Sequence, residues 1–154
     1  MSKSVSTILV ATDFSDASNR ATTYAFELAR ALKSRLYLMH VVPTSDVDVM
    51  VALQRHLESE ITSEALIEAY YEDAEKKLDA IVADHHGHDL IQERLIVTGN
   101  VVDEIVSWAQ AKQVGIIVVG THGRSGLEHA LIGSVAERVV RQAQSAVLVI
   151  PPTS

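Results

Sequence analysis

The chain alternates short apolar runs with segments of helical periodicity, and this alternation constrains its fold more than any other feature. The runs Ile8–Ala11 and Ile116–Val119 are continuous and carry several β-branched residues. Continuous apolar strands are typical of a parallel sheet that is buried on both faces. Strands that alternate with helices indicate an α/β fold with right-handed crossovers and helices on both faces of the sheet.

This pattern predicts strands over residues 5–12, 35–42, 90–98, 115–120 and 145–150. It predicts helices that begin at Ser15 or Asp16 and end near Lys33, and over residues 62–85, 101–112 and 134–142. The segment 43–60 is expected to be irregular or only partly helical, either a lid over a ligand or a mobile connection. No repeat or linker interrupts the chain, so residues 1–154 are expected to form one domain.

Composition excludes several classes of function. The 154 residues include no cysteine, which rules out disulfides, thiolate metal sites and cysteine nucleophiles. The net charge of -7 argues against a nucleic-acid or anionic membrane partner. No apolar run approaches the roughly 20 residues that span a bilayer, and the first residues show no signal-peptide pattern. We therefore expect a cytoplasmic protein.

Ligands of doubly wound sheets bind at the carboxyl ends of the strands, where the winding direction reverses. Thr12 and Asp13 follow the first predicted strand, Val41 ends the second and Gly120 ends the fourth. These residues meet at one crevice if the first strand lies between the second and the fourth. Asp13 would then be placed to accept hydrogen bonds from the hydroxyls of a ribose.

The segment after the fourth strand has the pattern Gly120-x2-Gly123-x9-Gly133-Ser134. Glycines permit positive φ and close approach of a ligand to the backbone. Gly133-Ser134 precedes the last predicted helix, whose N-terminal amides would cradle a phosphate. We interpret the pattern as a nucleotide site; the alternative, that the glycines serve only as turn and cap residues, stays open. The spacing matches neither the Rossmann fingerprint nor the P-loop.

On this motif the chain resembles the ATP-binding branch of the universal stress protein family. The opening Ile8–Ser15 and the ending Val147–Pro151 are also similar to that family. The resemblance implies an open five-stranded parallel sheet in the order 3-2-1-4-5, like that of the adenine nucleotide alpha hydrolases. It implies ATP, with Mg²⁺ or Mn²⁺, across the ends of strands one and four. The implied contacts are Thr12, Asp13, Val41, Gly120, His122, Gly123, Arg124, Gly133, Ser134 and Val135.

The resemblance also implies a homodimer through the last strand, Ser145–Ile150. An apolar strand at the edge of a sheet is a pairing hazard unless it is covered, which favours the same conclusion independently. The family often has a hydroxyl residue where Ala136 stands, so one phosphate donor is missing from this chain.

The function implied is that of a nucleotide-dependent regulatory or stress-response protein with at most slow ATP hydrolysis. Two alternatives stay open. One is an enzyme that uses an adenine nucleotide, of the phosphatase or nucleotidyltransferase type, with His122 or Asp13 as its base. The other is an interaction module that binds no nucleotide.

Two further histidine features are expected to be structural. The cluster His85-His86-x-His88 could be a metal site, but it lies at a predicted helix end, where imidazoles are favoured by the helix dipole. His40, inside the second strand, is expected to be a core histidine.

Overall fold

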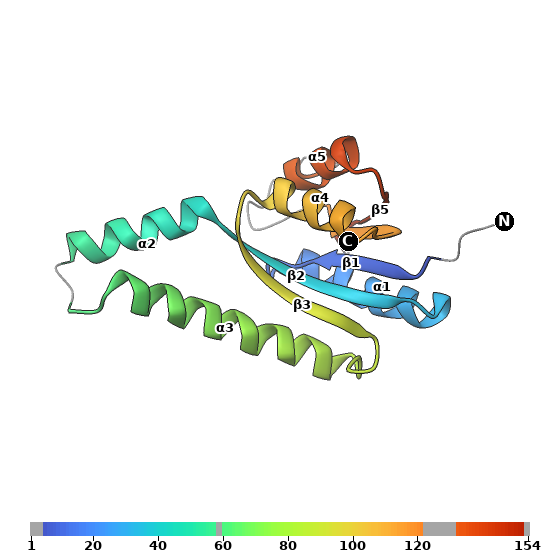
Figure 1. The fold of residues 1–154 in the computed structure, drawn as a ribbon, viewed down its shortest axis with the longest axis horizontal. Coiled ribbons are helices and arrows are strands. Elements are labelled where there is room, and N and C mark those ends of the chain that lie inside the picture. The colour runs from blue at the N-terminus through green and yellow to red at the C-terminus, as the bar shows by residue number, and fades with distance from the viewer. Residues whose placement is uncertain (1–4, 58–59, 122–131, 153–154) are drawn as a thin grey trace.

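A computed structural model describes residues 5–57, 60–121 and 132–152, and in it five parallel strands form one sheet (Figure 1). The strands are β1 (Thr7–Ala11), β2 (Arg35–Pro43), β3 (Ile91–Gly99), β4 (Ile116–Gly120) and β5 (Ala146–Ile150). Their order is β3-β2-β1-β4-β5, and all four neighbouring pairs are parallel. This confirms the α/β class and the predicted order, with β1 at the centre.

Helices cover both faces of the sheet, as predicted (Figure 1). One face packs against α1 (Asp16–Leu32) and α3 (Ser63–Asp84), and the other packs against α4 (Val101–Ala111) and α5 (Ser134–Gln142). Successive residues of each strand point to opposite faces of the sheet, so Ile8 and Val10 belong to one core and Leu9 to the other. The sheet therefore separates two apolar cores.

Side-chain caps explain where three helices begin. Ser15 accepts from the amide of Ser18, Thr62 from that of Ala65, and Asn100 from that of Asp103. Each cap satisfies an amide that has no partner within its own helix. Ser15, rather than Asp16, is thus the N-cap of α1.

Of the two alternatives for 43–60, irregular structure was wrong and partial helix is what forms. Residues Thr44–His56 form the helix α2, which with α3 makes an arm that projects from the sheet (Figure 1). None of the residues of α2 is fully buried. Val47, Met50 and Val51 are half-buried, whereas Val49 and Leu53 are exposed. Apolar residues on two faces obscure the single stripe by which a helix is recognised in a sequence.

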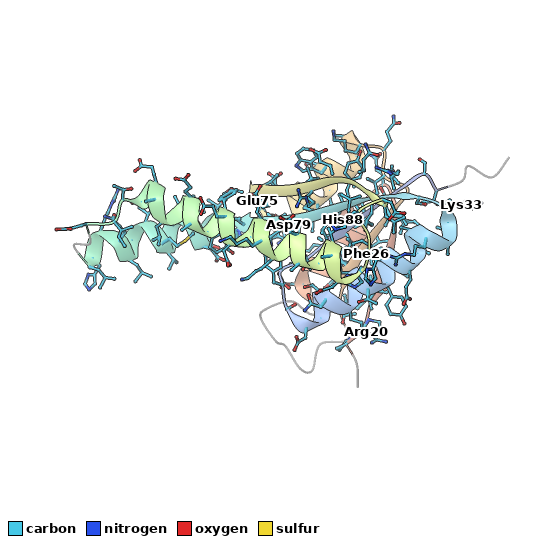
Figure 2. The ribbon with its side chains drawn as sticks, turned by 90° about the horizontal axis from the view of Figure 1, so that it is seen from below. Arg20, Phe26, Lys33, Glu75, Asp79 and His88 are labelled. Carbon is cyan, nitrogen blue, oxygen red and sulfur yellow. The ribbon has the colours of Figure 1, made fainter. Side chains whose placement is uncertain are left out.

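Helical periodicity accounts for the buried face of α1 only in part. Ala21, Ala25 and Ala29 recur every four residues and are buried, but Tyr24 and Leu32, which continue the same apolar spacing, are 41% and 42% exposed. The largest buried side chain of this helix is instead Phe26, which is fully buried. In Figure 2 it lies beside the C-terminal part of α3. Along the described residues, no helix combines the length and hydrophobicity that crossing a bilayer requires.

Candidate functional site

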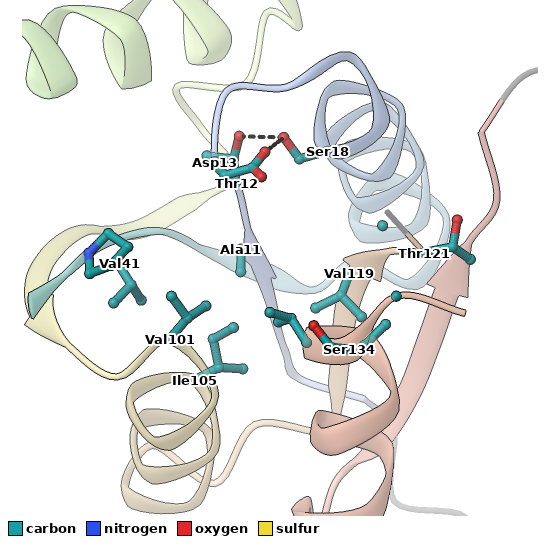
Figure 3. Close-up of a pocket in the computed structure, with 15 residues that line it drawn as sticks. Ala11, Thr12, Asp13, Ser18, Val41, Val101, Ile105, Val119, Thr121 and Ser134 are labelled. Carbon is teal, nitrogen blue, oxygen red and sulfur yellow. Dashed lines mark hydrogen bonds between the residues drawn. The ribbon is translucent and has the colours of Figure 1, made fainter. Parts of the chain in front are cut away.

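A cavity of about 350 Å³ lies at the carboxyl ends of β1, β2 and β4 (Figure 3). Its volume is within the range of small-molecule sites. It occupies the place where the winding of the sheet reverses, between the neighbours β2 and β4 of the central strand. The lining residues are Ala11, Thr12, Asp13, Ser18, Val41, Pro43, Val101, Ile105, Val119, Gly120, Thr121, Gly133, Ser134, Val135 and Ala136.

The loop from β1 to α1 presents Asp13 at one side of the cavity (Figure 3). Its Oδ1 accepts from the amide of Ser15 at 3.0 Å and from the hydroxyl of Ser18 at 2.9 Å. These donors fix the carboxylate near the first turn of α1, where the helix dipole favours negative charge. The position of Asp13 is therefore built into the start of the helix.

The hydroxyl of Thr12 forms hydrogen bonds with the same loop and the first turn of α1. It accepts from the amide of Phe14 at 3.0 Å and shares a hydrogen bond with the hydroxyl of Ser18 at 3.1 Å. Thr12 is only 3% exposed. Since its hydroxyl bonds to two neighbours, Thr12 shapes the loop that carries Asp13.

Phe14 turns this loop through an uncommon backbone conformation. Its φ of 65° is in the left-handed region, which large side chains rarely adopt. The ring centroid lies 4.4 Å from that of His40, which is buried as predicted and whose Nδ1 donates to the carbonyl of Thr12 at 2.8 Å. The tip of the loop is thus packed against β2.

The backbone of Val41 forms the wall of the cavity on the side of β2. The amide of Arg35 donates to Ser6, and the carbonyl of Met39 accepts from Thr12, so alternate residues of β2 bond toward β1. The last partners in that ladder are Ala11 and Met39. Val41 is the next residue in the series, so its amide and carbonyl point past the end of β1 toward the cavity that it lines.

Apolar side chains make the floor of the cavity beside Val41. Val101 and Ile105 project from α4 and Val119 from β4 (Figure 3). Ile105 is 1% and Val119 4% exposed. The cavity therefore offers an apolar floor below the edge of Val41 and the carboxylate of Asp13 on another side.

The N-terminus of α5 closes the opposite side. Gly133 is its N-cap, and no side chain among the described residues caps this helix. The amide of Gly133 donates to the carbonyl of Thr121, so it is not among the amides left for a phosphate. The first amides within the helix, from Ser134 to Ala136, have no acceptor in their own helix and open onto the cavity.

Positive φ does not explain the glycine at 133. Its φ is -68°, a value that any residue adopts. Gly120 ends β4 and lines the cavity as predicted, and so do Ser134 and Val135. The predicted contacts His122, Gly123 and Arg124 lie outside the described residues.

With this geometry established, comparison with known proteins gives a clear result. The model of the universal stress protein family matches residues 5–151. The chain belongs to the universal stress protein family. Universal stress protein MJ0531 of Methanocaldococcus jannaschii is 38% identical over 143 residues, which cover 93% of this chain and 80% of that protein.

Solved structures of universal stress proteins have the same fold as this chain. Hypothetical protein MJ0577 of Methanocaldococcus jannaschii superposes with a TM-score of 0.78 at 26% identity, over 99% of both chains. The universal stress protein of Archaeoglobus fulgidus in complex with dAMP gives 0.62 at 26% identity, over 96% of this chain and 99% of the other. A universal stress protein in complex with cAMP gives 0.61 at 28% identity, over 96% and 98%.

The cavity of this universal stress protein is also lined by residues that were not predicted from the sequence. Ser18, Pro43, Val101, Ile105 and Val119 all line it. Ser18 had a usable signal, because the third residue after a serine N-cap faces back toward the capping loop. The others are apolar residues of ordinary strand and helix patterns, which carry no signal of a ligand.

The histidine cluster is structural at His85. Its ring stacks on Phe26 with centroids 4.6 Å apart and an interplanar angle of 3°. Nδ1 donates to the carbonyl of Ile81 at 2.8 Å, and Nε2 shares a hydrogen bond with the hydroxyl of Thr23 at 3.0 Å. Both ring nitrogens are thus engaged. Within the described residues, no group of three metal-ligating side chains comes together.

Proposed function

We propose that this universal stress protein binds an adenine nucleotide, ATP, in the cavity at the ends of β1, β2 and β4, and acts in the cytoplasm as a nucleotide-dependent regulator. One observation carries the proposal. Asp13, the open backbone edge of Val41 and the N-terminus of α5 converge on a single cavity. Neighbours with the same fold are complexes with dAMP and cAMP, which like ATP contain an adenine, a pentose and a phosphate.

Each wall of the cavity suits one part of the nucleotide. Adenine would pack on the floor of Val101 and Ile105 and pair its edge with the amide and carbonyl of Val41. The ribose hydroxyls would donate to the carboxylate of Asp13. The phosphates would accept from the first amides of α5 and from the hydroxyl of Ser134, where the helix dipole also favours negative charge.

A divalent cation fits the same chemistry. Ser134 supplies a hydroxyl oxygen beside the phosphates, and the phosphates would provide most of the oxygen ligands that Mg²⁺ and Mn²⁺ prefer. The ion would neutralise phosphate charge. A carboxylate that is already bonded to Ser15 and Ser18 is held as a binding group rather than released as a base, which favours ligand binding over turnover.

The first experiment analyses the nucleotide that accompanies the purified protein, by denaturation and mass spectrometry, and titrates the emptied protein with ATP by calorimetry. About one adenine nucleotide per chain, or a micromolar titration, supports the proposal. Asp13→Asn should weaken ATP binding at least about tenfold, a loss of about 1.4 kcal/mol. Asp16→Asn is the matched control, because Asp16 is exposed in the first turn of α1 and does not line the cavity.

Two results would contradict the proposal. An emptied protein that ignores millimolar ATP would favour the interaction module, and unchanged affinity in Asp13→Asn would remove the ribose assignment. Many turnovers per minute would favour the adenine-nucleotide enzyme instead.

We further propose that two chains pair through β5. β5 is an edge of the sheet, with β4 as its neighbour. Along it Leu148 is 37% exposed and Val147 and Val149 are half-buried. Antiparallel pairing of β5 with its own copy would satisfy the open backbone groups and cover these side chains.

A further inference from the structure

The strand β3 forms one edge of the sheet, opposite to the edge formed by β5. Its neighbour on the inner side is β2, and none of the described residues forms a strand on its outer side. Because β3 has nine residues, the open row of backbone groups along it is long. An edge of this kind is a template for an added strand unless something opposes the pairing.

The register between β2 and β3 shows which backbone groups face outward. Odd-numbered residues of β2 bond toward β1, so even-numbered ones bond toward β3, as the amide of Leu36 does to the carbonyl of Leu90 at 2.8 Å. In a parallel pair, such a residue bonds to the two neighbours of the residue opposite it and not to that residue itself. Beyond the register shift at Leu36, the residues of β3 opposite even-numbered residues of β2 are Arg94, Ile96 and Thr98. The amides and carbonyls of these three residues therefore point to the open edge.

A groove lies beside this edge, on the face of the sheet that α3 covers. Arg94 forms an ion pair with Asp79 of α3, and the hydroxyl of Thr98 forms a hydrogen bond with that of Tyr71. Helix α3 thus runs alongside β3 (Figures 1 and 2). The groove between the two elements has a volume of about 560 Å³, and Leu78 and Ile96 form its apolar part.

Three carboxylates of α3 give the groove a negative charge. Glu68, Glu72 and Glu75 line it, and their spacing of four and three residues places them on one face of the helix. Within the part of the chain that the structure describes, none of the three forms an ion pair, and Arg94 is already paired with Asp79. Like charges at these spacings destabilise a helix. A cation that binds between them would remove that repulsion.

The same charges disfavour a second copy of this chain as the added strand. Two β3 edges that pair antiparallel are related by a two-fold axis perpendicular to the sheet, which places both copies of α3 on the same face. The three glutamates of each copy would then border the same junction between strands, where like charges are unfavourable. A strand that fits this edge must instead carry cations where it passes the groove.

We propose that the open edge of β3 binds an extended, basic segment of another protein, which adds to the sheet as a further strand. Its backbone pairs with the outward groups of Arg94, Ile96 and Thr98. Every second side chain of the segment lies over the groove, because successive side chains of a strand point to opposite faces. Lysine or arginine at those alternate positions meets the three glutamates. The backbone hydrogen bonds supply affinity, and the charges select the partner.

A synthetic peptide of about ten residues that alternates lysine with threonine tests this proposal. Its binding is measured by fluorescence anisotropy at low salt, where the attraction between charges is least screened. The wild-type protein should bind it with a dissociation constant below about 100 μM. The combined variant Glu68→Gln, Glu72→Gln and Glu75→Gln should bind it at least about tenfold more weakly. This variant loses only like-charge repulsion within α3, so it should fold as the wild type does, which circular dichroism checks.

Two controls separate strand addition from attraction between net charges. The first combines Glu27→Gln, Asp48→Asn and Asp84→Asn, which remove the same charge from exposed positions outside the groove. It should change the dissociation constant less than about twofold. The second is the same peptide with every backbone amide methylated, which keeps its lysines but has no donor for a strand ladder. This peptide should bind at least about tenfold more weakly than its parent.

Amide hydrogen exchange, followed by nuclear magnetic resonance, locates the bound peptide. Binding should slow exchange at Arg94, Ile96 and Thr98, whose amides face the open edge, and leave β5 unchanged. The proposal would be overturned by a peptide that does not bind, by a glutamine variant and a control variant that bind alike, or by a methylated peptide that binds as well as its parent. Slower exchange at β5 and not at β3 would also overturn it, because the peptide would then occupy the other edge.

Discussion

The ammonium nitrogen of Lys77, on α3, lies 5.2 Å from the ring centroid of Phe14, in the loop that carries Asp13. The half of α3 that packs on the sheet therefore contacts the loop of the candidate nucleotide site. A cation over an aromatic face contributes about 0.5–1 kcal/mol at an exposed position. Lys77 also pairs with Asp73 at 2.9 Å, so a single substitution would remove two interactions.

A double-mutant cycle isolates the contact between Lys77 and Phe14. Lys77→Met, Phe14→Leu and the double variant should show a coupling of about 0.5–1 kcal/mol in the free energy of unfolding, measured with urea. The ion pair with Asp73 is lost in both backgrounds and cancels. Coupling indistinguishable from zero would mean that the cation and the ring are neighbours without attraction.

Ser18 should matter for ligand binding although it is not expected to touch the nucleotide. Ser18→Ala removes the 2.9 Å hydrogen bond to Asp13 and the 3.1 Å bond to Thr12, both in the loop. We expect a stability loss of about 1 kcal/mol and about threefold to tenfold weaker ATP binding by calorimetry. Ser107→Ala, an exposed serine in α4, is the matched control. An equal loss of affinity in both variants would contradict this role.

Gly87 is required by the core. A Cβ added there would lie 2.1 Å from Cε1 of Phe26, whose ring is fully buried. Gly87→Ala should therefore destabilise the protein by about 2 kcal/mol, because an overpacked core must shift its side chains. Thermal unfolding followed by circular dichroism measures this.

Gly99→Ala is the control for Gly87→Ala. A Cβ at Gly99 would meet Glu104, whose Oε1 is 2.6 Å away. That carboxylate is the end of a flexible side chain and can move, so the loss should stay below about 0.5 kcal/mol. Similar losses at both glycines would show that the ring of Phe26 is not the cause.

Pairing through β5 predicts that a charge on this strand halves the mass of the protein in solution. Leu148→Glu should convert the dimer into a monomer at micromolar concentration, because a buried pairing edge would then carry facing charges. Light scattering after gel filtration measures the mass. The melting temperature at matched low concentration should change little, since Leu148 is 37% exposed in the single chain. A wild-type protein that is already monomeric would exclude this interface.

The sequence was sufficient to predict the strands of the sheet and the location of the candidate site. Continuous apolar runs predicted β1 and β4, and the rule for doubly wound sheets then placed Asp13 and Val41 at one crevice, as they are. It was insufficient for α2, whose apolar residues serve two faces. It was equally insufficient for Phe26, because burial at that position depends on the packing of α3, which is distant in the chain.

The backbone of Gly133 is the other feature of the site that the sequence did not predict. The motif allowed a positive φ at Gly133, whereas its φ is ordinary and its amide donates to Thr121, just after β4. A spacing of glycines does not specify that hydrogen bond.

The burial along α3 is unequal, since Ala74, Leu78 and Val82, all in its second half, are its buried residues. In the first half, Tyr70 and Tyr71 reach the sheet, at His40 and Thr98, but no residue there is fully buried. The arm can therefore open or be cut by a protease while the sheet keeps its core. Hydrogen exchange should accordingly differ between the two halves of one continuous helix. The same division makes the arm the part of the chain where insertions and deletions are tolerated, because no strand must change its register to accommodate them.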